Sequence, residues 1–379
     1  MKKIKKILII SGSKAEYYIL KKIITKIIKN FQTKVLIHAG HLQTLYGKSG
    51  NHVDILLKKK IIKSKSNWGK SNTEETIIKS MSIQMNLISK IIKKFKPDAI
   101  LIVGDRTESL SVANVSLIYQ IPLIHIHGGE LTLGSIDEKI RHAISKISSI
   151  HFVIHNEYKK RLMQMGENKK FIRNFGSPSL EILKEKKILT SSQFFKKFKL
   201  KSKDFILVSI NSENSNKKTA QVIKNTIVAL NKYKNFIKVV TYPNPDINNS
   251  VIINSINKVK KREDYKVFKF LGDNYCQFLA HCKFMVGNSS SGIIEAPFFK
   301  KIFVNVGNRQ KGRILSNSII NSSYDKKDII KNIKLAHLQK KLNYNKSFYK
   351  SNTAMNIVRY LKKCNLEDFK YKKFIDLKK

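Results

Sequence analysis

Short apolar runs alternate with longer segments of helical period along the whole chain. Buried parallel strands read as continuous apolar runs, and apolar residues three or four apart predict amphipathic helices. The pattern therefore predicts a parallel α/β architecture. The predicted strands of the first half are residues 7–10, 34–38, 99–103, 122–126 and 150–154. The predicted helices between them are 17–29, 75–94, 108–119 and 138–147.

A second set of strands follows at residues 205–210, 237–241, 266–268, 284–286 and 302–306, with a helix-like segment at 293–299. Gly176-Ser177-Pro178 and the lysine-rich stretch 184–203 separate the two sets. Because 379 residues exceed what one core usually carries, we expect two Rossmann-like domains that face a central cleft. The expected limits are 1–180 for the first domain, 181–352 for the second, and 353–379 for a helix (353–363) and tail that pack back on the first.

The charge of the chain changes this picture less than its size suggests. The formal net charge is +48, from 74 lysines and arginines against 26 aspartates and glutamates. Most of the basic residues are lysines, and lysine, isoleucine and asparagine are abundant throughout, as AT-rich codons favour. The basic residues form no separate arm and are not interleaved with aromatic residues for base stacking. We therefore expect no nucleic-acid partner.

The cysteines and the N-terminus indicate the compartment. Cys276, Cys282 and Cys364 lack the spacing of a metal site and cannot all pair, which favours a reducing cytoplasm. The apolar run at 7–10 is too short for a signal peptide, and no run approaches the length of a membrane span. We expect a cytoplasmic protein without a membrane partner.

The most informative motif is Gly-Asn-Ser-Ser-Ser-Gly-Ile-Ile-Glu at residues 287–295. A strand that breaks into such a turn and then opens a helix directs backbone N–H groups at one point. Ser289 and Ser290 add hydroxyl donors, and Gly292 allows close approach of the backbone. Glu295 follows, within reach of the hydroxyls of a sugar attached to a phosphate. The motif predicts a nucleotide-diphosphate site, and an ordinary serine-rich loop is the alternative.

Arginine is scarce in a chain where lysine is the default. The planar guanidinium grips phosphate or carboxylate at two points, so arginines in glycine- and acid-rich turns indicate binding sites. The four that lie in such turns are Arg106, Arg141, Arg309 and Arg313. Two of them, Arg309 and Arg313, come one connection after the serine-rich motif and strengthen the phosphate-binding prediction.

Three polar loops of the first domain each follow a predicted strand, at residues 12–16, 104–108 and 127–130. The carboxyl ends of parallel strands meet at one edge of the sheet, so these loops are expected to surround the cleft. Their candidate residues are Lys14, Asp105, Arg106 and Glu130.

Asp137 and Arg141 follow these loops and lie four residues apart, on one face of a predicted helix. Such a pair is usually a surface ion pair worth ~0.3–0.5 kcal/mol. Its nearness to Glu130 favours a functional interpretation. We expect Asp105, Glu130 and Asp137 to converge on the cleft as acid/base groups.

Histidines gather in the same region. His125 and His127 alternate on a predicted strand, and Glu130 follows, so a metal site is one interpretation. Packed or substrate-facing histidines are the other. The chain offers neither a His-x-x-x-His helix nor a cysteine partner, and we expect no metal.

Together these residues carry a resemblance to a known family. The matching segments, in order, are Gly104-Asp105-Arg106, 125–144 with its continuation 146–152, Tyr242-Pro243-Asn244 with Asp246, and 287–313. They resemble the hydrolysing UDP-N-acetylglucosamine 2-epimerases, the branch that makes N-acetylmannosamine for sialic acid and whose close relatives supply legionaminic-type sugars. The resemblance extends from about residue 4 to about residue 360. It implies two Rossmann-like domains in the glycosyltransferase-B arrangement, usually in a homodimer.

The resemblance also implies the reaction and the residues. UDP-N-acetylglucosamine and water give N-acetylmannosamine and UDP, without NAD or another cofactor. In the first step UDP is eliminated across C1–C2 to leave a 2-acetamidoglucal. Water then adds to this intermediate. The implied catalytic residues are Asp105, Glu130, Asp137, His127 and Arg141. The implied substrate and UDP residues are Lys14, His41, Arg106, Tyr242, Asn244, Ser289, Ser290, Gly292, Glu295, Arg309 and Arg313, with serines and arginines on the phosphates and Glu295 on the ribose.

Three positions depart from the family pattern. His127 stands where relatives often have an acidic residue, and Lys14 stands where arginine is common. Asn211-Ser212 replaces the usual His-Pro pair after the first strand of the second domain, and asparagine cannot shuttle a proton.

The alternatives left open are the same chemistry on a UDP- or GDP-linked 2,4-diacetamido-trideoxy sugar, a glycosyltransferase, and a binder of nucleotide sugars without turnover.

Overall fold

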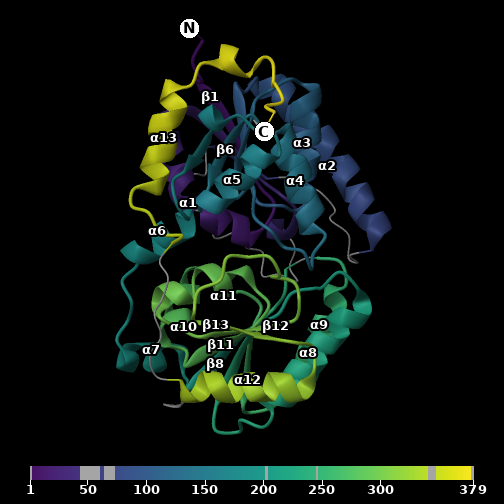
Figure 1. The fold of residues 1–379 in the computed structure, drawn as a ribbon, viewed down its shortest axis with the longest axis vertical. Coiled ribbons are helices and arrows are strands. Elements are labelled where there is room, and N and C mark those ends of the chain that lie inside the picture. Colours follow the sequence, from purple (N-terminus) through teal and green to yellow (C-terminus); the bar gives the residue numbers. More distant parts are fainter. Residues whose placement is uncertain are drawn as a thin grey trace.

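The structure is a computed structural model that describes residues 2–42, 60–63, 73–200, 204–244, 246–339 and 347–376. Two α/β domains lie one above the other along the long axis of the molecule (Figure 1). Each is built on a parallel sheet, as predicted.

The sheet of the N-terminal domain has seven strands in the order β3-β2-β1-β4-β5-β6-β7. They are β1 (Lys6–Ser11), β2 (Gln32–Ile37), β3 (Ile61–Lys63), β4 (Ala99–Val103), β5 (Leu123–Ile126), β6 (Ile150–Val153) and β7 (Ile172–Asn174). The five predicted strands are confirmed within two residues at each end. The two added strands at the sheet edges, β3 and β7, have three residues each, too few to show a pattern.

Helices cover both faces of this sheet. They are α1 (Lys14–Ile28), α2 (Glu74–Phe95), α3 (Thr107–Ile118), α4 (Asp137–Ile147), α5 (Asn156–Gln164) and α6 (Pro178–Glu185). In α1, Ser13 is the N-cap and accepts a hydrogen bond from the N–H of Glu16 (3.3 Å). Its buried residues Leu20, Ile23 and Ile27 follow the helical period and pack against the sheet. The four helices predicted here are therefore confirmed.

The sheet of the C-terminal domain has six strands in the order β10-β9-β8-β11-β12-β13. They are β8 (Phe205–Ser209), β9 (Ile237–Thr241), β10 (Tyr265–Phe268), β11 (Phe284–Gly287), β12 (Phe303–Val306) and β13 (Ile319–Ser322). The helices are α7 (Ser191–Phe198), α8 (Asn216–Leu230), α9 (Asn249–Val259), α10 (Tyr275–His281), α11 (Ser290–Ile294) and α12 (Lys326–Leu338). The five predicted strands are again confirmed.

The prediction of one helix-like segment at 293–299 is wrong in its bounds. The α-helix α11 starts at Ser290 and ends at Ile294, and a separate 3₁₀ turn, η7 (Pro297–Phe299), follows it. Pro297 has no N–H and cannot continue the α-helical hydrogen bonds, so the helix stops before it. Glu295 is consequently the C-cap of α11.

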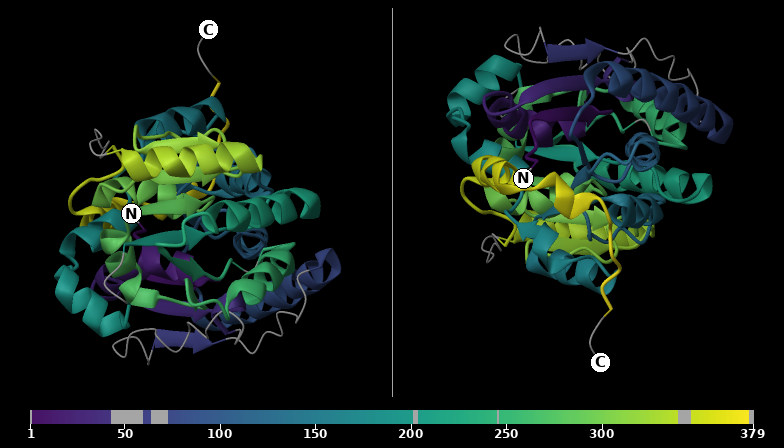
Figure 2. Two further views of the ribbon diagram at one scale, coloured as in Figure 1. Left: turned by 90° about the horizontal axis from the view of Figure 1, so that it is seen from below. Right: turned by 90° about the horizontal axis from the view of Figure 1, so that it is seen from above.

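The C-terminal segment returns to the N-terminal domain. Helix α13 (Thr353–Lys363) packs against α1, and the 3₁₀ turn η8 (Leu366–Phe369) follows. Figure 2 (right) shows this yellow segment passing the N-terminus, where the N–H of Leu366 donates to the carbonyl of Lys2 (2.8 Å). The expected domain limits at residues 180 and 352 stay a prediction. Among the described residues, no helix combines the length and apolar character needed to span a bilayer.

In both sheets the strand order reverses beside the first strand, at β1/β4 and at β8/β11. Ligands of open parallel sheets bind at such points, outside the carboxyl ends of the strands. The loops after these strands lie between the two domains in Figure 1, and residues that follow β1, β8 and β11 line one cavity.

The packing of α11 on β12 gives a first prediction. A Cβ at Gly292 would lie 2.5 Å from ring atoms of the buried Phe303. We expect Gly292→Ala to lower the free energy of unfolding by ~1–3 kcal/mol through overpacking, measured by urea denaturation. Ser250→Ala, at an exposed position of α9, is the control and should stay within about 0.5 kcal/mol of the parent. Equal stability of the two variants would contradict the close packing.

Candidate active site between the two domains

A cavity of about 520 Å³ lies between the domains, and both sheets contribute their carboxyl edges to its wall. The predicted residues that line it are Lys14, His41, His127, Tyr242, Asn244, Ser289, Ser290 and Glu295. The other predicted residues are not among its lining residues in the described part of the chain: Asp105, Arg106, Glu130, Asp137, Arg141, Gly292, Arg309 and Arg313. All of these except Gly292 take part in ion pairs, described below.

The serine-rich turn forms one wall of the cavity. Gly287 ends β11 with a φ of 143°, and a Cβ there would collide with the carbonyl oxygen of Ser209 on β8, so the position requires glycine. Ser289 is the N-cap of α11, and its Oγ accepts a hydrogen bond from the N–H of Ser291 (3.4 Å). The hydroxyl oxygens of Ser291 and Tyr275 lie 2.5 Å apart. These contacts fix the turn at the cavity wall.

Glu295 lines the same end of the cavity and is only 8% exposed. Burial raises the pKa of Glu295 to about 7, against the opposing effect of a hydrogen bond with Ser179. Tyr18 and Tyr275 lie close, and burial followed by the charge of Glu295 raises the pKa of both hydroxyls. The carboxyl group thus lies among neutral hydroxyls, an environment that suits the hydroxyls of a bound sugar.

Lys14 brings a cation to the cavity at the start of α1. Its Nζ donates to the carbonyl of Lys269 (3.2 Å) and lies 5.4 Å from the centroid of the Phe270 ring, both in the C-terminal domain. Burial lowers the pKa of Lys14 to about 8. A phosphate beside it would favour the charged ammonium.

His41 and Tyr242 contribute ring surface to the cavity, while their polar atoms bond within their own domains. The Nε2 of His41 lies 2.9 Å from the Oγ of Ser11, and the hydroxyl of Tyr242 donates to the Oδ1 of Asn257 (2.9 Å).

Asp105, in the loop after β4, is paired with the fully buried Arg141 of α4. The Nη1 of Arg141 also donates to the backbone carbonyl of Glu130 (2.9 Å). Burial alone would raise the pKa of Asp105, but the charges of Arg141, Arg313 and Arg309 together lower it below its ordinary value. Asp105 is therefore held as a carboxylate.

Glu130 connects both domains. Its Oε2 is paired with Arg313 of the C-terminal domain, and its Oε1 lies 2.6 Å from the Nδ1 of His127. His127 has a φ of 70°, so it leaves the strand direction of β5 and does not continue the face of His125. Burial, followed by the charge of Arg313, lowers the pKa of His127 to about 3, and the imidazole is neutral.

Asp137 begins α4 and meets Arg309 of the C-terminal domain, whose Nη2 lies 3.1 Å from its Oδ2. Burial, followed by repulsion from Asp105, raises the pKa of Asp137 to about 6, although Arg309 opposes the shift. Asp105 and Asp137 thus share one site with pKa values moved in opposite directions. This divergence is what acid/base pairs require.

Arg106 is the N-cap of α3 and reaches across the cleft. Its Nη1 lies 2.7 Å from the Oδ1 of Asp246, and its Nη2 lies 3.3 Å from the Oε1 of Glu108.

Asn211, at the usual histidine position, bonds to other loops of its own domain. Its N–H donates to the Oδ1 of Asn288 (2.7 Å), and the Nδ2 of Asn288 donates to the carbonyl of Asn211 (2.9 Å). The Oδ1 of Asn211 accepts a hydrogen bond from the N–H of Asn244 (3.0 Å). The side chain therefore holds the loop after β9 against the loop after β8.

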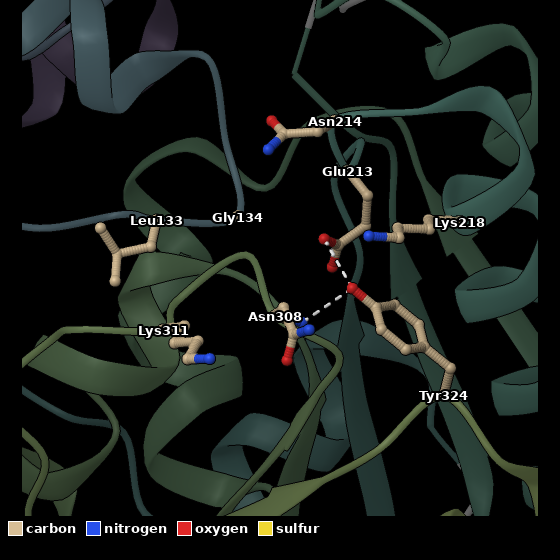
Figure 3. A pocket seen from close by; sticks show the side chains of 8 residues that line it. All are labelled: Leu133, Gly134, Glu213, Asn214, Lys218, Asn308, Lys311 and Tyr324. Atoms are coloured by element: carbon tan, nitrogen blue, oxygen red, sulfur yellow. Dashed lines mark hydrogen bonds between the residues drawn. The ribbon is translucent and has the colours of Figure 1, made fainter.

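Glu213 is the centre of a second polar network that was not predicted. It accepts hydrogen bonds from the hydroxyl of Tyr324 (3.2 Å), the Nδ2 of Asn288 (3.2 Å) and the N–H of Arg309 (3.3 Å). A smaller cavity of about 220 Å³ lies beside it, with Tyr324 also accepting from the N–H of Asn308 (Figure 3). Glu213 therefore fixes the backbone that carries Arg309. Its position in the loop that follows β8 was the signal available in the sequence.

Known proteins resemble this chain over most of its length. A statistical model of the UDP-N-acetylglucosamine 2-epimerase family matches residues 25–362. A Campylobacter jejuni protein named GDP/UDP-N,N'-diacetylbacillosamine 2-epimerase (hydrolyzing) is 38% identical over 86% of this chain and 86% of its own length. An Escherichia coli protein named polysialic acid biosynthesis protein P7 is 31% identical over 98% of each chain.

The fold has solved counterparts. The crystal structure of UDP-GlcNAc 2-epimerase from Neisseria meningitidis, bound to UDP-GlcNAc, superposes with a TM-score of 0.77 at 17% identity and covers 94% of this chain and 99% of that one. The two domains thus have the glycosyltransferase-B-like arrangement of these enzymes. From the match over 25–362 and the similarity to the hydrolysing relatives, the chain belongs to the UDP-N-acetylglucosamine 2-epimerase family.

Proposed function

We propose that the protein is a hydrolysing 2-epimerase that converts UDP-N-acetylglucosamine and water to N-acetylmannosamine and UDP, for nonulosonic (sialic-type) acid biosynthesis. One observation carries the proposal. Glu130 contacts His127 in the wall of the cavity, Asp105 and Asp137 lie close to each other behind that wall, and the Ser289–Glu295 turn forms another part of the wall. A nucleotide sugar has the same two parts, a diphosphate with ribose and a sugar with a weakly acidic C2 proton.

The proposed residues divide between these two parts. Lys14, Ser289 and Ser290 bind the diphosphate, and Glu295 accepts hydrogen bonds from the ribose hydroxyls. His41, Tyr242 and Asn244 line the cleft around the substrate. Gly292 lets α11 approach closely, and Arg309 and Arg313 supply positive charge as UDP leaves. Arg106, which is paired with Asp246 and Glu108, stays in the wall of the cleft.

The chemistry needs a base and an acid. Loss of the C2 proton to a carboxylate and departure of UDP with the C1–O electron pair leave a 2-acetamidoglucal; water then adds to C1 while a proton returns to C2 from the opposite face. Asp105, held ionised by Arg141, suits the base. Asp137, with its pKa raised to about 6, suits the acid, and His127 and Glu130 complete the site.

A second substrate is favoured by one comparison. The relative at 38% identity is named for N,N'-diacetylbacillosamine linked to GDP or UDP. The second candidate function is therefore the same reaction on a 2,4-diacetamido-trideoxy sugar. The E. coli relative, named for polysialic acid biosynthesis, supports the first candidate. In both cases we propose a homodimer, on the family resemblance, and a reducing cytoplasm, which suits three free cysteines.

Proton NMR in deuterated water decides between these candidates. With UDP-N-acetylglucosamine we expect free UDP and N-acetylmannosamine carrying deuterium at C2. The UDP- and GDP-linked diacetamido sugars are compared at equal concentration. A kcat/KM that is higher for a diacetamido sugar would replace the first candidate by the second, and no turnover of any of the three would refute the epimerase.

Asp105→Asn tests the acid/base assignment. The amide keeps the shape but cannot take up a proton, so we expect kcat to fall at least ~10²-fold while the Kd of UDP changes little. The measurements are coupled UDP release and calorimetric titration with UDP. Asp204→Asn, in an exposed ion pair with Lys283, is the control. Near-normal turnover of Asp105→Asn would remove Asp105 from the mechanism.

Glu295→Gln tests the nucleotide turn through pH. Because the folded-state pKa of about 7 lies above the ordinary 4.5, the native state holds this proton more tightly, and wild-type stability falls as pH rises toward 7. Glutamine has no titrating proton, so the stability of the variant does not fall in this way as pH rises. We expect the variant to be more stable than wild type on the order of 1–3 kcal/mol at pH 8, with the difference shrinking toward pH 5.

The same variant should bind UDP more weakly, because an amide is a poorer acceptor for ribose hydroxyls than a carboxylate. Urea denaturation and UDP titration at pH 5.5 and 8 are the measurements, with the exposed Glu263→Gln as control. A stability difference independent of pH would contradict the buried, proton-binding carboxyl, and unchanged UDP affinity would place the ribose elsewhere.

A further inference from the structure

Ion pairs cross the cleft in both directions. Two join carboxylates of the N-terminal domain to arginines of the C-terminal domain, Asp137 to Arg309 and Glu130 to Arg313. The pair between Arg106 and Asp246 runs the other way, with the arginine on the N-terminal domain and the carboxylate on the C-terminal domain.

Asp246 lies between the two arginines that face it. Its Oδ1 is 2.7 Å from the Nη1 of Arg106, and its Oδ2 is 3.9 Å from the Nη2 of Arg309. Since Arg309 in turn lies 3.1 Å from the Oδ2 of Asp137, the charges alternate from one domain to the other and back. One carboxylate therefore links the loop after β4 to the arginine that faces a proposed acid/base residue.

The surroundings of Arg106 indicate that its charge is already matched. Its Nη2 lies 3.3 Å from Glu108, and its Nε lies 3.9 Å from Glu16. Burial and the neighbouring Glu108 raise the pKa of Glu16 to about 8, and Glu108 and Asp246 lie nearer to Arg106 than Glu16 does. A phosphate at this guanidinium would have to approach two carboxylates, which is unfavourable.

We propose that Asp246 is a positioning residue whose pair with Arg106 forms a cross-cleft latch, which holds the two domains closed while the sugar is converted. This rests on the proposed function. After the C2 proton and UDP have left, the 2-acetamidoglucal is neutral and no longer tied to the diphosphate. Only the closed walls keep it in place until water adds to C1 and a proton returns to C2.

Asp246→Asn tests the latch. The amide keeps the size of the side chain but loses the charge, so the domains should open more often and release the intermediate. With the better substrate of the NMR experiment, we expect kcat/KM to fall roughly 10-fold. We also expect free 2-acetamidoglucal to accumulate alongside UDP at several times the wild-type fraction. Asp246→Glu, which keeps the charge, should restore most of the activity and retention of the intermediate.

Asp204→Asn, which removes a carboxylate from an ion pair within one domain, is the matched control and should behave as wild type. Release of the intermediate separates the latch from a structural role, because a variant that is only less stable loses activity without changing the product ratio. Wild-type kcat/KM together with a wild-type product ratio in Asp246→Asn would overturn the proposal.

Small-angle scattering separates this proposal from the proposed function. With UDP as the probe, we expect Asp246→Asn to have a larger radius of gyration than the Asp204→Asn control. We expect this larger radius even if the protein turns over none of the sugars. The lack of turnover would refute the epimerase but not the latch. Equal radii with UDP would overturn the latch while the epimerase could still stand.

Discussion

The structure depends on one electrostatic constraint, which is that the charges in the cleft between the domains must pair. An isolated carboxylate buried away from water is strongly destabilising, and removal of one partner of a buried pair is equally so. Asp105, Glu130 and Asp137 each face an arginine. Since two of those arginines come from the other domain, the site is complete only when the domains are closed. The arrangement of these carboxylates and the contact between the domains thus follow from the same pairs.

The sequence predicts the scaffold of this site well and its pairing poorly. Buried strands such as β1 and β4 are continuous apolar runs, and their loops meet at the sheet edge for topological reasons. The pairing partners lie far apart in the chain: 140 residues separate Arg106 from Asp246, and 172 separate Asp137 from Arg309. No local pattern encodes such contacts. The resemblance to a family located the residues, and the structure shows which of them meet.

The errors of prediction also have physical causes. A strand of three residues, such as β3 or β7, is too short to show a period, and a single proline divides the expected helix at 293–299. Asn211 is more instructive. Its residue type indicates a lost proton carrier, and the structure adds that its side chain accepts a hydrogen bond that holds the loop after β9. That loop also carries Asp246, so Asn211 supports the backbone near a cross-cleft contact.

The end of the cavity at the Ser289–Glu295 turn, where we propose that the nucleotide binds, differs from the paired carboxylates. Burial moves both Glu295 and Lys14 toward their neutral forms, the first by raising its pKa and the second by lowering it. Among the described residues, neither group has an ion-pair partner of the kind that Arg141 provides for Asp105. A diphosphate would favour the charged form of the lysine, and ribose hydroxyls would favour the carboxylate, so ligand binding and protonation are coupled at both positions. Under the proposed function, the carboxylates of the chemical step are therefore held by arginines, whereas the groups that bind the nucleotide change their charge when it binds.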